Sequence, residues 1–281
     1  MAFTKQHQSK DKKMKRILTT LFISFAFLTT VFAADQKPPL PVDSCKAQVP
    51  YGIPTGNKAN TIICRTGYIL EHDGNAKIPL WVSWTLTPDH AIGCSVRSNA
   101  FATDQSLPEG KRSEPKDYAG SGYDQGHLAN DGDQSWSDAT EHESFYMSNM
   151  SPQLPPVNRG TWKSLESATR AWVHQTNHPH TVYAGNIWSA KSKTIGKNKV
   201  IVPDYLFKIV IDNTTKKSYA FIMPNIDKIK PDFTDYQVTV KDVEKASGVT
   251  FNVPDSKDSK NKSIEADLKS VLNDKRAECK K

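Results

Sequence analysis

The chain has 281 residues, a formal net charge of +7 and a sequence pI of about 9.0. Residues 1–33 hold six Lys or Arg and one acidic residue, which leaves about +2 on the rest of the chain. Charge alone therefore does not indicate a polyanionic partner. Residues 34–281 are numerous enough to form one sizeable hydrophobic core.

The first predicted element is a leader. Lys15 and Arg16 precede an apolar run of about 16 residues, and Val31 and Ala33 offer small residues at the −3 and −1 positions of a cleavage site. We expect a signal peptide, residues 1–33, that is cut after Ala33. A membrane anchor is the alternative, but the run is short for a transmembrane helix. The mature chain is then one secreted or periplasmic domain, residues 34–281, that is not bound to a membrane.

Four cysteines follow the leader, at positions 45, 64, 94 and 279. An even number in an exported chain predicts two disulfides, and three pairings are possible. The spacing contains no C-x-x-C pair, so a structural zinc site is not favoured.

The N-terminal half predicts irregular structure around one clear strand. Residues 34–60 are rich in Pro, Gly, Lys and Asn and indicate an irregular arm. Apolar and polar residues alternate over residues 80–86, which is typical of a β-strand with one buried face. Residues 95–122 predict a long surface loop, in which Arg97 is a solvated charge by default. Residues 137–146 predict a short helix.

Asn158 opens the strongest helical pattern in the chain. Side chains that recur with a helical period predict the packed face: Trp162, Leu165, Thr169, Trp172 and Val173. Asn158, Glu166 and Arg170 are spaced by whole multiples of four residues and form a polar stripe beside that face. Such a helix can hold a polar site rigidly against a core.

Histidines at 174, 178 and 180 follow this helix. They allow a metal site, but no acid or cysteine accompanies them, so we expect an exposed connection. Further strands and helices are predicted in the C-terminal half: strands at 181–187, 206–211 and 219–223, a helix at 239–247 that stops at Gly248, and a last helix at 264–272. The second and third of these strands are predicted to form a hairpin.

His127 is the candidate general base, in the segment Tyr123-Asp124-Gln125-Gly126-His127-Leu128. A histidine near its ordinary pKa of about 6.5 can take a proton from an attacking water at neutral pH. Gly126 allows a sharp backbone turn beside it. Asp124 is expected to accept a hydrogen bond from another site residue and not to contact the substrate itself.

Asn158 is the candidate metal ligand. Mg²⁺ keeps most of its water ligands, so one amide oxygen at a helix start is a sufficient protein anchor. Mn²⁺ is a possible substitute. Glu166 is placed to orient metal-bound water, and arginines suit phosphate because the guanidinium donates two hydrogen bonds. The arginine candidates are Arg97, Arg159 and Arg170, and Gln125 is a further candidate substrate contact.

Together these motifs resemble the DNA/RNA non-specific endonucleases, nucleases of the ββα-metal or His-Me finger class. The similar segments extend over much of residues 45–248: 80–86, 124–129, 145–153, 158–166, 182–185 and 237–244. The resemblance implies an α+β fold, a mixed α/β sandwich whose central antiparallel sheet is flanked by helices and a ββα-metal finger. It also implies His127 as base, Asn158 as sole protein ligand of Mg²⁺, Glu166 acting through water, and arginines, Arg97 and Arg170, at the site.

Two positions depart from the family pattern. Gln125 stands where many members have arginine, and Asn130 stands where proline is common. The first change removes a positive charge beside the base. The leading interpretation is a secreted nuclease that cuts DNA and RNA with Mg²⁺. A nucleic-acid-binding protein of the same fold with little turnover is the alternative, and a disulfide-stapled envelope protein is a third.

Overall fold

The computed structural model describes residues 1–2, 36–56, 60–254 and 279. The expected signal peptide and the expected helix at 264–272 lie outside the described residues. From Gln36 onward the described residues form one compact unit. Within them, no helix has the length and apolarity that a membrane span requires.

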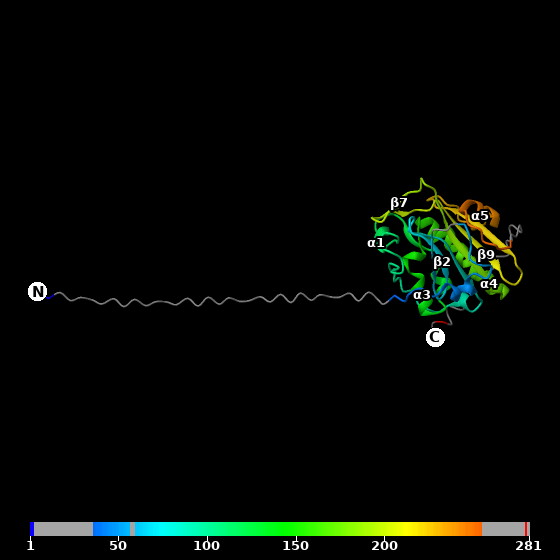
Figure 1. Cartoon of the computed structure of the whole chain (residues 1–281), viewed down its shortest axis with the longest axis horizontal. Helices are drawn as coiled ribbons and strands as arrows, with labels where there is room; N and C mark the ends of the chain where they lie inside the picture. Colours follow the sequence, from blue (N-terminus) through cyan, green and yellow to red (C-terminus); the bar gives the residue numbers. More distant parts are fainter. Residues whose placement is uncertain (3–35, 57–59, 255–278, 280–281) are drawn as a thin grey trace. The chain divides into compact units, whose positions relative to one another are not determined.

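A seven-stranded sheet forms the centre of this unit, and all of its neighbouring strands are antiparallel (Figure 1). In spatial order the strands are β1 (Thr61–Cys64), β2 (Ile69–Asp73), β3 (Ile78–Leu86), β6 (His180–Ile187), β9 (Tyr205–Asp212), β10 (Ser218–Pro224) and β11 (Gln237–Val238). The strands predicted at 181–187, 206–211 and 219–223 are thus present, and the hairpin between the last two is confirmed.

Two long helices cover opposite faces of this sheet. Helix α4 (Lys163–Thr176) packs Leu165 and Val173 into a core with Trp84 and Val210. Helix α5 (Val240–Ser247) contributes to a separate core on the other face, with β-sheet side chains such as Trp81, Tyr183 and Phe207. Its predicted ends are confirmed, because the Thr239 hydroxyl caps it and Gly248 ends it at φ 73°. The expected α+β sandwich is therefore confirmed.

The prediction that β3 buries only one of its two faces was wrong, because both faces are buried. Trp81 and Ser83, on the supposed polar face, are both fully buried. Trp81 packs in the α5-side core, and the Ser83 hydroxyl donates to the Gln48 carbonyl at 2.6 Å. Gln48 ends a 3₁₀ helix, Val42–Gln48, so part of the expected irregular arm is ordered and covers this face.

A second, two-stranded sheet carries the sequence motif. Strand β4 (Asp124–His127) pairs antiparallel with β5 (Met150–Gln153), and α4 follows β5, which completes a ββα finger. Short helices occupy the connections before and between these strands: α1 (Pro115–Tyr118), α2 (Asp131–Gln134) and α3 (Asp138–Ser144). Helix α3 confirms the helix predicted within 137–146. The 95–122 segment is less exposed than expected, because Asp104, Leu107 and Tyr118 are buried.

The four cysteines form two disulfides, Cys45–Cys64 and Cys94–Cys279, which is one of the three pairings that the sequence left open.

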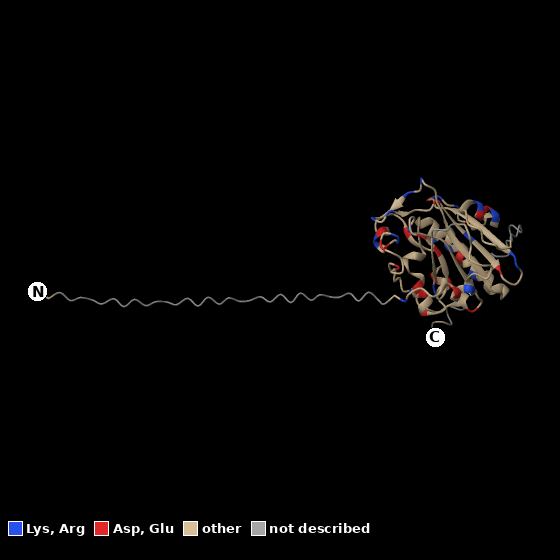
Figure 2. Cartoon of the chain, viewed as in Figure 1, with Lys and Arg blue, Asp and Glu red and all other residues tan. Residues whose placement is uncertain are grey.

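The remaining two-stranded sheet, β7 (Thr194–Ile195) and β8 (Val200–Ile201), lies in a loop with several lysines. In the view of Figure 2, basic and acidic segments are interspersed over the unit, with basic ones along the loop that carries β7.

The expected exposed connection at His174–His180 was only partly correct. His180 begins β6 and is fully buried, and His178 contacts Asp212 at 2.8 Å. Asp212 comes from the end of β9, so His178 does have an acidic partner, but one that is distant in the sequence. The part of the chain that the structure describes contains no group of three or more His, Cys, Asp or Glu side chains that could hold a metal.

Candidate active site

A cleft of about 370 Å³ lies where β4, α2 and the start of α4 meet. Its lining contains seven of the eight predicted site residues, and the eighth, Asp124, bonds to two of them. The complete lining is Arg97, Gln125, His127, Asn130, Asp131, Gly132, Asn158, Arg159, Lys163, Glu166 and Arg170. Residues from three separate stretches of the chain thus meet at one surface.

His127 ends β4, where its backbone pairs with Met150 of β5. The imidazole packs edge-on against Phe145, with ring centroids 4.7 Å apart, and is tilted against Phe101 at 5.6 Å. The residue is 7% exposed, and its Nε2 is buried without a hydrogen-bond partner among the described residues. The ring is therefore held by packing and keeps its polar atoms uncommitted.

The expectation that His127 keeps its ordinary pKa was wrong. Burial, with a smaller contribution from the positive charge of Arg97, lowers the pKa of His127 to about 3. The sequence did not show that two phenylalanines enclose the ring. At neutral pH the imidazole is uncharged, the form that can accept a proton.

Asn158 lies in a wide, π-type turn, Val157–Trp162, that precedes α4. The turn is interrupted at Gly160, whose φ of −108° and ψ of −107° are not helical. The Asn158 Nδ2 donates to Asp124 Oδ2 at 2.9 Å, which fixes the amide. Its Oδ1 accepts no hydrogen bond from the described residues and is available to a ligand in the cleft.

Asp124 also binds Arg159 through both carboxylate oxygens, at 2.8 Å to Nε and 2.6 Å to the terminal nitrogen. Burial raises the pKa of Asp124, but the hydrogen bonds from Arg159 and Asn158 outweigh it and hold the pKa below its usual value. Asp124 is therefore an anion that orients Asn158 from behind. This is the position that the sequence predicted for it.

Glu166 is half-buried at the wall of the cleft. Burial raises its pKa to about 7, although Lys208 and Arg170 oppose this rise. Arg170 lies one turn further along α4 and is buried. It donates to Asp133 at 2.7 Å and to the Asn130 side chain at 2.8 Å, so α4 and α2 are tied together beneath the cleft.

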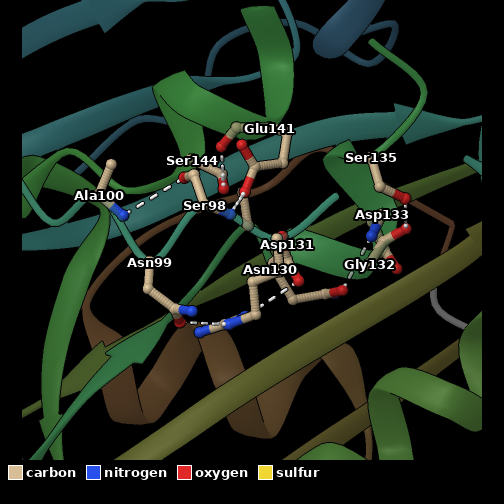
Figure 3. A network of polar contacts seen from close by, with 12 residues as sticks. Ser98, Asn99, Ala100, Asn130, Asp131, Gly132, Asp133, Ser135, Glu141 and Ser144 are labelled. Atoms are coloured by element: carbon tan, nitrogen blue, oxygen red, sulfur yellow. Dashed lines mark hydrogen bonds and ion pairs between the residues drawn. The ribbon is translucent and has the colours of Figure 1, made fainter. Parts of the chain in front are cut away.

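Arg97 reaches the cleft from the loop that follows Cys94, and it is not a free solvated charge. It donates to the Asn99 side chain at 2.8 Å and to Asp131 at 2.9 Å, and it lies 4.9 Å over the Phe145 ring. Figure 3 shows this region, where Ser98 donates its backbone N–H to Glu141. The contacts direct Arg97 toward the same cleft as His127.

The side chains in the cleft fit a hard divalent cation. The donor set is an amide oxygen, on Asn158, with the carboxylates of Glu166 and Asp131 in the same lining. Oxygen donors of this kind suit Mg²⁺ or Mn²⁺, and a cleft of this size leaves room for water ligands. Asn158 would be the direct protein ligand, because its oxygen is free and its orientation is fixed.

Gln125 lines the cleft, and its amide donates weakly to the Met147 sulfur at 3.7 Å. Sequence reasoning missed three neighbours of the site: Asp131, Lys163 and Lys208. Asp131 and Lys163 line the cleft, and the positive charge of Lys208 opposes the rise in the pKa of Glu166. The Asn130-capped turn of α2 was a signal for Asp131, since Asx caps mark helix starts.

Comparison with known proteins finds a family model and several relatives that match most of this chain. The family model described as DNA/RNA non-specific endonuclease matches residues 47–258. Mitochondrial endonuclease G of Bos taurus is 31% identical over 217 residues, which cover 72% of this chain and 71% of the relative. A nuclease of Nostoc sp. is 31% identical over 204 residues, covering 68% and 73%.

A solved structure agrees with these sequence relatives. The complex of EndoG with its inhibitor EndoGI matches with a TM-score of 0.68 and 28% identity. The match covers 74% of this chain and 90% of the EndoG chain. The ββα finger described above is therefore shared with a nuclease fold.

Proposed function

The chain belongs to the DNA/RNA non-specific endonuclease family, a group of metal-dependent hydrolases of nucleic acids, and on that premise we propose that it is an exported, Mg²⁺-dependent nuclease with His127 as general base. The observation that supports this most is the pairing of an uncommitted imidazole with an amide oxygen fixed by Asp124, both in one cleft. We infer that a scissile phosphate binds between them.

His127 would accept a proton from the attacking water. Its imidazole is neutral at neutral pH, and a bound phosphate, being negative, favours the protonated product. Phe101 and Phe145 fix the ring, so proton transfer requires no reorientation. Glu166, in the same cleft lining, would orient a water of the cation.

Asn158 would hold the cation through its Oδ1. Bound there, Mg²⁺ or Mn²⁺ offsets charge on the phosphoryl oxygens and stabilises the departing oxygen. Arg97 and Arg170 add fixed positive charge at the cleft. Arg159 and Gln125 would contact the nucleic-acid backbone at its rim, because Arg159 is exposed there.

The proposed site contacts phosphate and not bases, so it would act on both DNA and RNA. Binding would weaken as salt rises. Export as a secreted or periplasmic domain, residues 34–281, is supported by the leader pattern at 1–33 and by two disulfides, which are compatible with an oxidising compartment. The mature domain would not associate with a membrane.

The test is plasmid DNA and RNA cleavage by the purified mature chain, with Mg²⁺ and with chelator. We expect His127→Ala to abolish Mg²⁺-dependent cleavage while the folded circular-dichroism spectrum persists. His142→Ala is the matched control, since His142 is exposed on α3 and lies outside the cleft lining. Cleavage by His127→Ala at the unsubstituted rate would exclude His127 as base.

The same assay separates the alternative function. Gln125 in place of arginine and the low pKa of His127 both favour a protein that binds nucleic acid with little turnover. That protein would retard nucleic acid in a gel and leave it intact with Mg²⁺ and with chelator. Fragments that form only with Mg²⁺ identify the enzyme.

A further inference from the structure

The β7–β8 hairpin carries a concentrated group of positive charges. Residues 190–202, here called the lysine hairpin, contain four lysines and no acidic residue. All four are exposed: Lys191, Lys193, Lys197 and Lys199. Among the described residues, none of these ammonium groups forms an ion pair or a hydrogen bond. The like charges repel one another, and a partner with several negative charges would relieve that repulsion.

The lysine hairpin is fastened to the rest of the molecule. Asn198 donates from its backbone N–H and from its side-chain amide to the two carboxylate oxygens of Asp117, at 3.0 and 2.8 Å. The backbones approach so closely that a Cβ on Gly196, whose φ is 66°, would lie 2.4 Å from the Asp117 Cα. The Ile201 N–H also donates to the Ala76 carbonyl at 3.0 Å. A fixed backbone therefore presents the lysines, so only their side chains need to be ordered by a ligand.

The apolar side of the lysine hairpin packs against the finger that carries the cleft. It shares one core with Met147 and Met150, to which it contributes Ile195, Val200 and Val202. Met150 pairs with His127 across the β4–β5 ladder, and Met147 accepts from the Gln125 amide. His127 and Gln125 both line the cleft. One apolar core thus joins the hairpin to the strand that carries the proposed base, and Figure 2 shows the basic segments that follow the hairpin.

We propose that the lysine hairpin binds the phosphate backbone of nucleic acid outside the cleft, along the part of the substrate that extends beyond the scissile phosphate. A cleft of about 370 Å³ holds a cation with its waters and a phosphate group, but a longer nucleic acid must continue over the surface. Lysine is a flexible point charge that suits phosphate and reads no base sequence. This inference rests on the proposed function and makes the binding site longer than the cleft.

Anionic lipid headgroups carry the same phosphate chemistry. Nucleic acid is the favoured partner because the lysine hairpin shares its core with the cleft-bearing finger. A membrane that covered the hairpin would have no use for that connection.

The main test variant neutralises all four side chains and keeps most of their length: Lys191→Gln, Lys193→Gln, Lys197→Gln and Lys199→Gln. The measurement is the Kd of the mature chain for a DNA duplex of about 30 base pairs, which is stiff at that length, with chelator present so that it stays intact. We expect Kd at about 0.15 M salt to rise at least about tenfold. The slope of log affinity against log salt should fall by about 0.9 for each phosphate contact that is lost.

The matched control removes the same amount of charge elsewhere. It neutralises four exposed lysines on the first 3₁₀ helix, on the β9–β10 turn and on α5: Lys46→Gln, Lys216→Gln, Lys217→Gln and Lys245→Gln. Each set contains one lysine with a positive φ, 55° at Lys199 and 63° at Lys216. We expect the control to bind as the unsubstituted chain does. Equal losses in both sets would show that net charge, and not the hairpin, determines affinity.

Cleavage of plasmid DNA with Mg²⁺ separates this inference from the proposed function. The hairpin variant should raise KM and leave kcat little changed, because its lysines do not touch the reacting atoms. If the unsubstituted chain cuts nothing but the hairpin variant loses duplex affinity, the proposed activity fails and the inference stands. If plasmid DNA is cut and the hairpin variant keeps its duplex affinity and salt slope, only the inference fails.

Two further measurements complete the test. Arginine at the same four positions keeps the charge and should keep the affinity and the salt slope, and a loss as large as that with glutamine would overturn the proposal. Vesicles of phosphatidylcholine and phosphatidylserine test the other source of phosphate. Sedimentation of the unsubstituted chain with them, together with unchanged duplex affinity in the hairpin variant, would assign the surface to a membrane instead. If the fourfold variant does not fold, the Lys191–Lys193 and Lys197–Lys199 pairs are replaced separately, and each should lose part of the salt slope.

Discussion

Asp124 and Arg159 form a two-pronged ion pair at the cleft, with nitrogen–oxygen distances of 2.8 and 2.6 Å. The same carboxylate accepts the Asn158 amide N–H. One anion on β4 therefore sets the orientation of the proposed ligand for the cation and of an exposed arginine. These two roles can be separated by substitution.

Asp124→Ala should weaken the use of the cation more than the binding of substrate. Without its acceptor the Asn158 amide can rotate, so we expect the Mg²⁺ concentration for half-maximal cleavage to rise about tenfold. Arg159→Gln keeps the Asp124–Asn158 bond and should leave that concentration unchanged while it raises KM. Equal shifts in both variants would show that Asp124 does not act through Asn158.

Gln125→Arg should strengthen binding of nucleic acid. Gln125 lines the cleft and makes only a weak contact with Met147, so a longer, charged side chain has little to displace. We expect the dependence of log affinity on log salt to steepen by about one phosphate contact. Gln125→Met, of similar length and without charge, should bind as the unsubstituted chain does. A salt slope unchanged by arginine would mean that this position does not face phosphate.

Arg170→Met should destabilise the fold by about 3–5 kcal/mol, because it leaves the buried Asp133 carboxylate without its ion-pair partner. Both side chains of the pair are buried, and the Trp84 indole also donates to Asp133, at 3.0 Å. The measurement is the free energy of unfolding in urea. Adding Asp133→Asn should restore part of the loss, and no recovery would place the effect in lost packing instead.

Asp212 should make unfolding sensitive to acid. Burial raises its pKa, but the His178 hydrogen bond and the amides of Thr214 and Thr215 outweigh this effect and lower the pKa to about 2. A depressed folded-state pKa contributes stability above the unfolded-state value near 3.8, and this stability is lost as pH falls to about 2. The contribution at neutral pH is about 2 kcal/mol. Asp212→Asn should be less stable at pH 7 and should flatten the stability curve between about pH 4 and pH 2, as followed by urea unfolding across that range.

The sequence could predict the cleft better than its electrostatics. The helical spacing of Glu166 and Arg170 placed both side chains on one side of α4, and both line the cleft. Asn158 also lines the cleft, but the expected helix start at Asn158 was wrong, because this residue lies in the interrupted turn before α4. Nothing local indicated that Phe101 and Phe145 would enclose His127, because those contacts join separate segments. A pKa depends on such long-range burial, so the expected value for His127 was wrong.

The strands and helices of the fold could be predicted from the sequence. Which faces of the sheet other elements cover could be predicted less well. Alternation at 80–86 is consistent with one solvated face, and only the packing of the 3₁₀ helix and α5 on that face buries Trp81. The strand Tyr205–Asp212 contains two charged residues, Lys208 in its interior and Asp212 at its end. The sequence of a strand does not show which groups from other elements surround its charged residues.

The wide turn at Val157–Trp162 sets the direction in which the Asn158 side chain points relative to α4. Helix α4 is fixed by its seat on the sheet, while Asn158 precedes the break at Gly160. Each residue in a regular helix advances the side-chain direction by about 100°. Loss of one residue from this turn would swing the amide oxygen away from the imidazole. The segment should accordingly accept no change in its length.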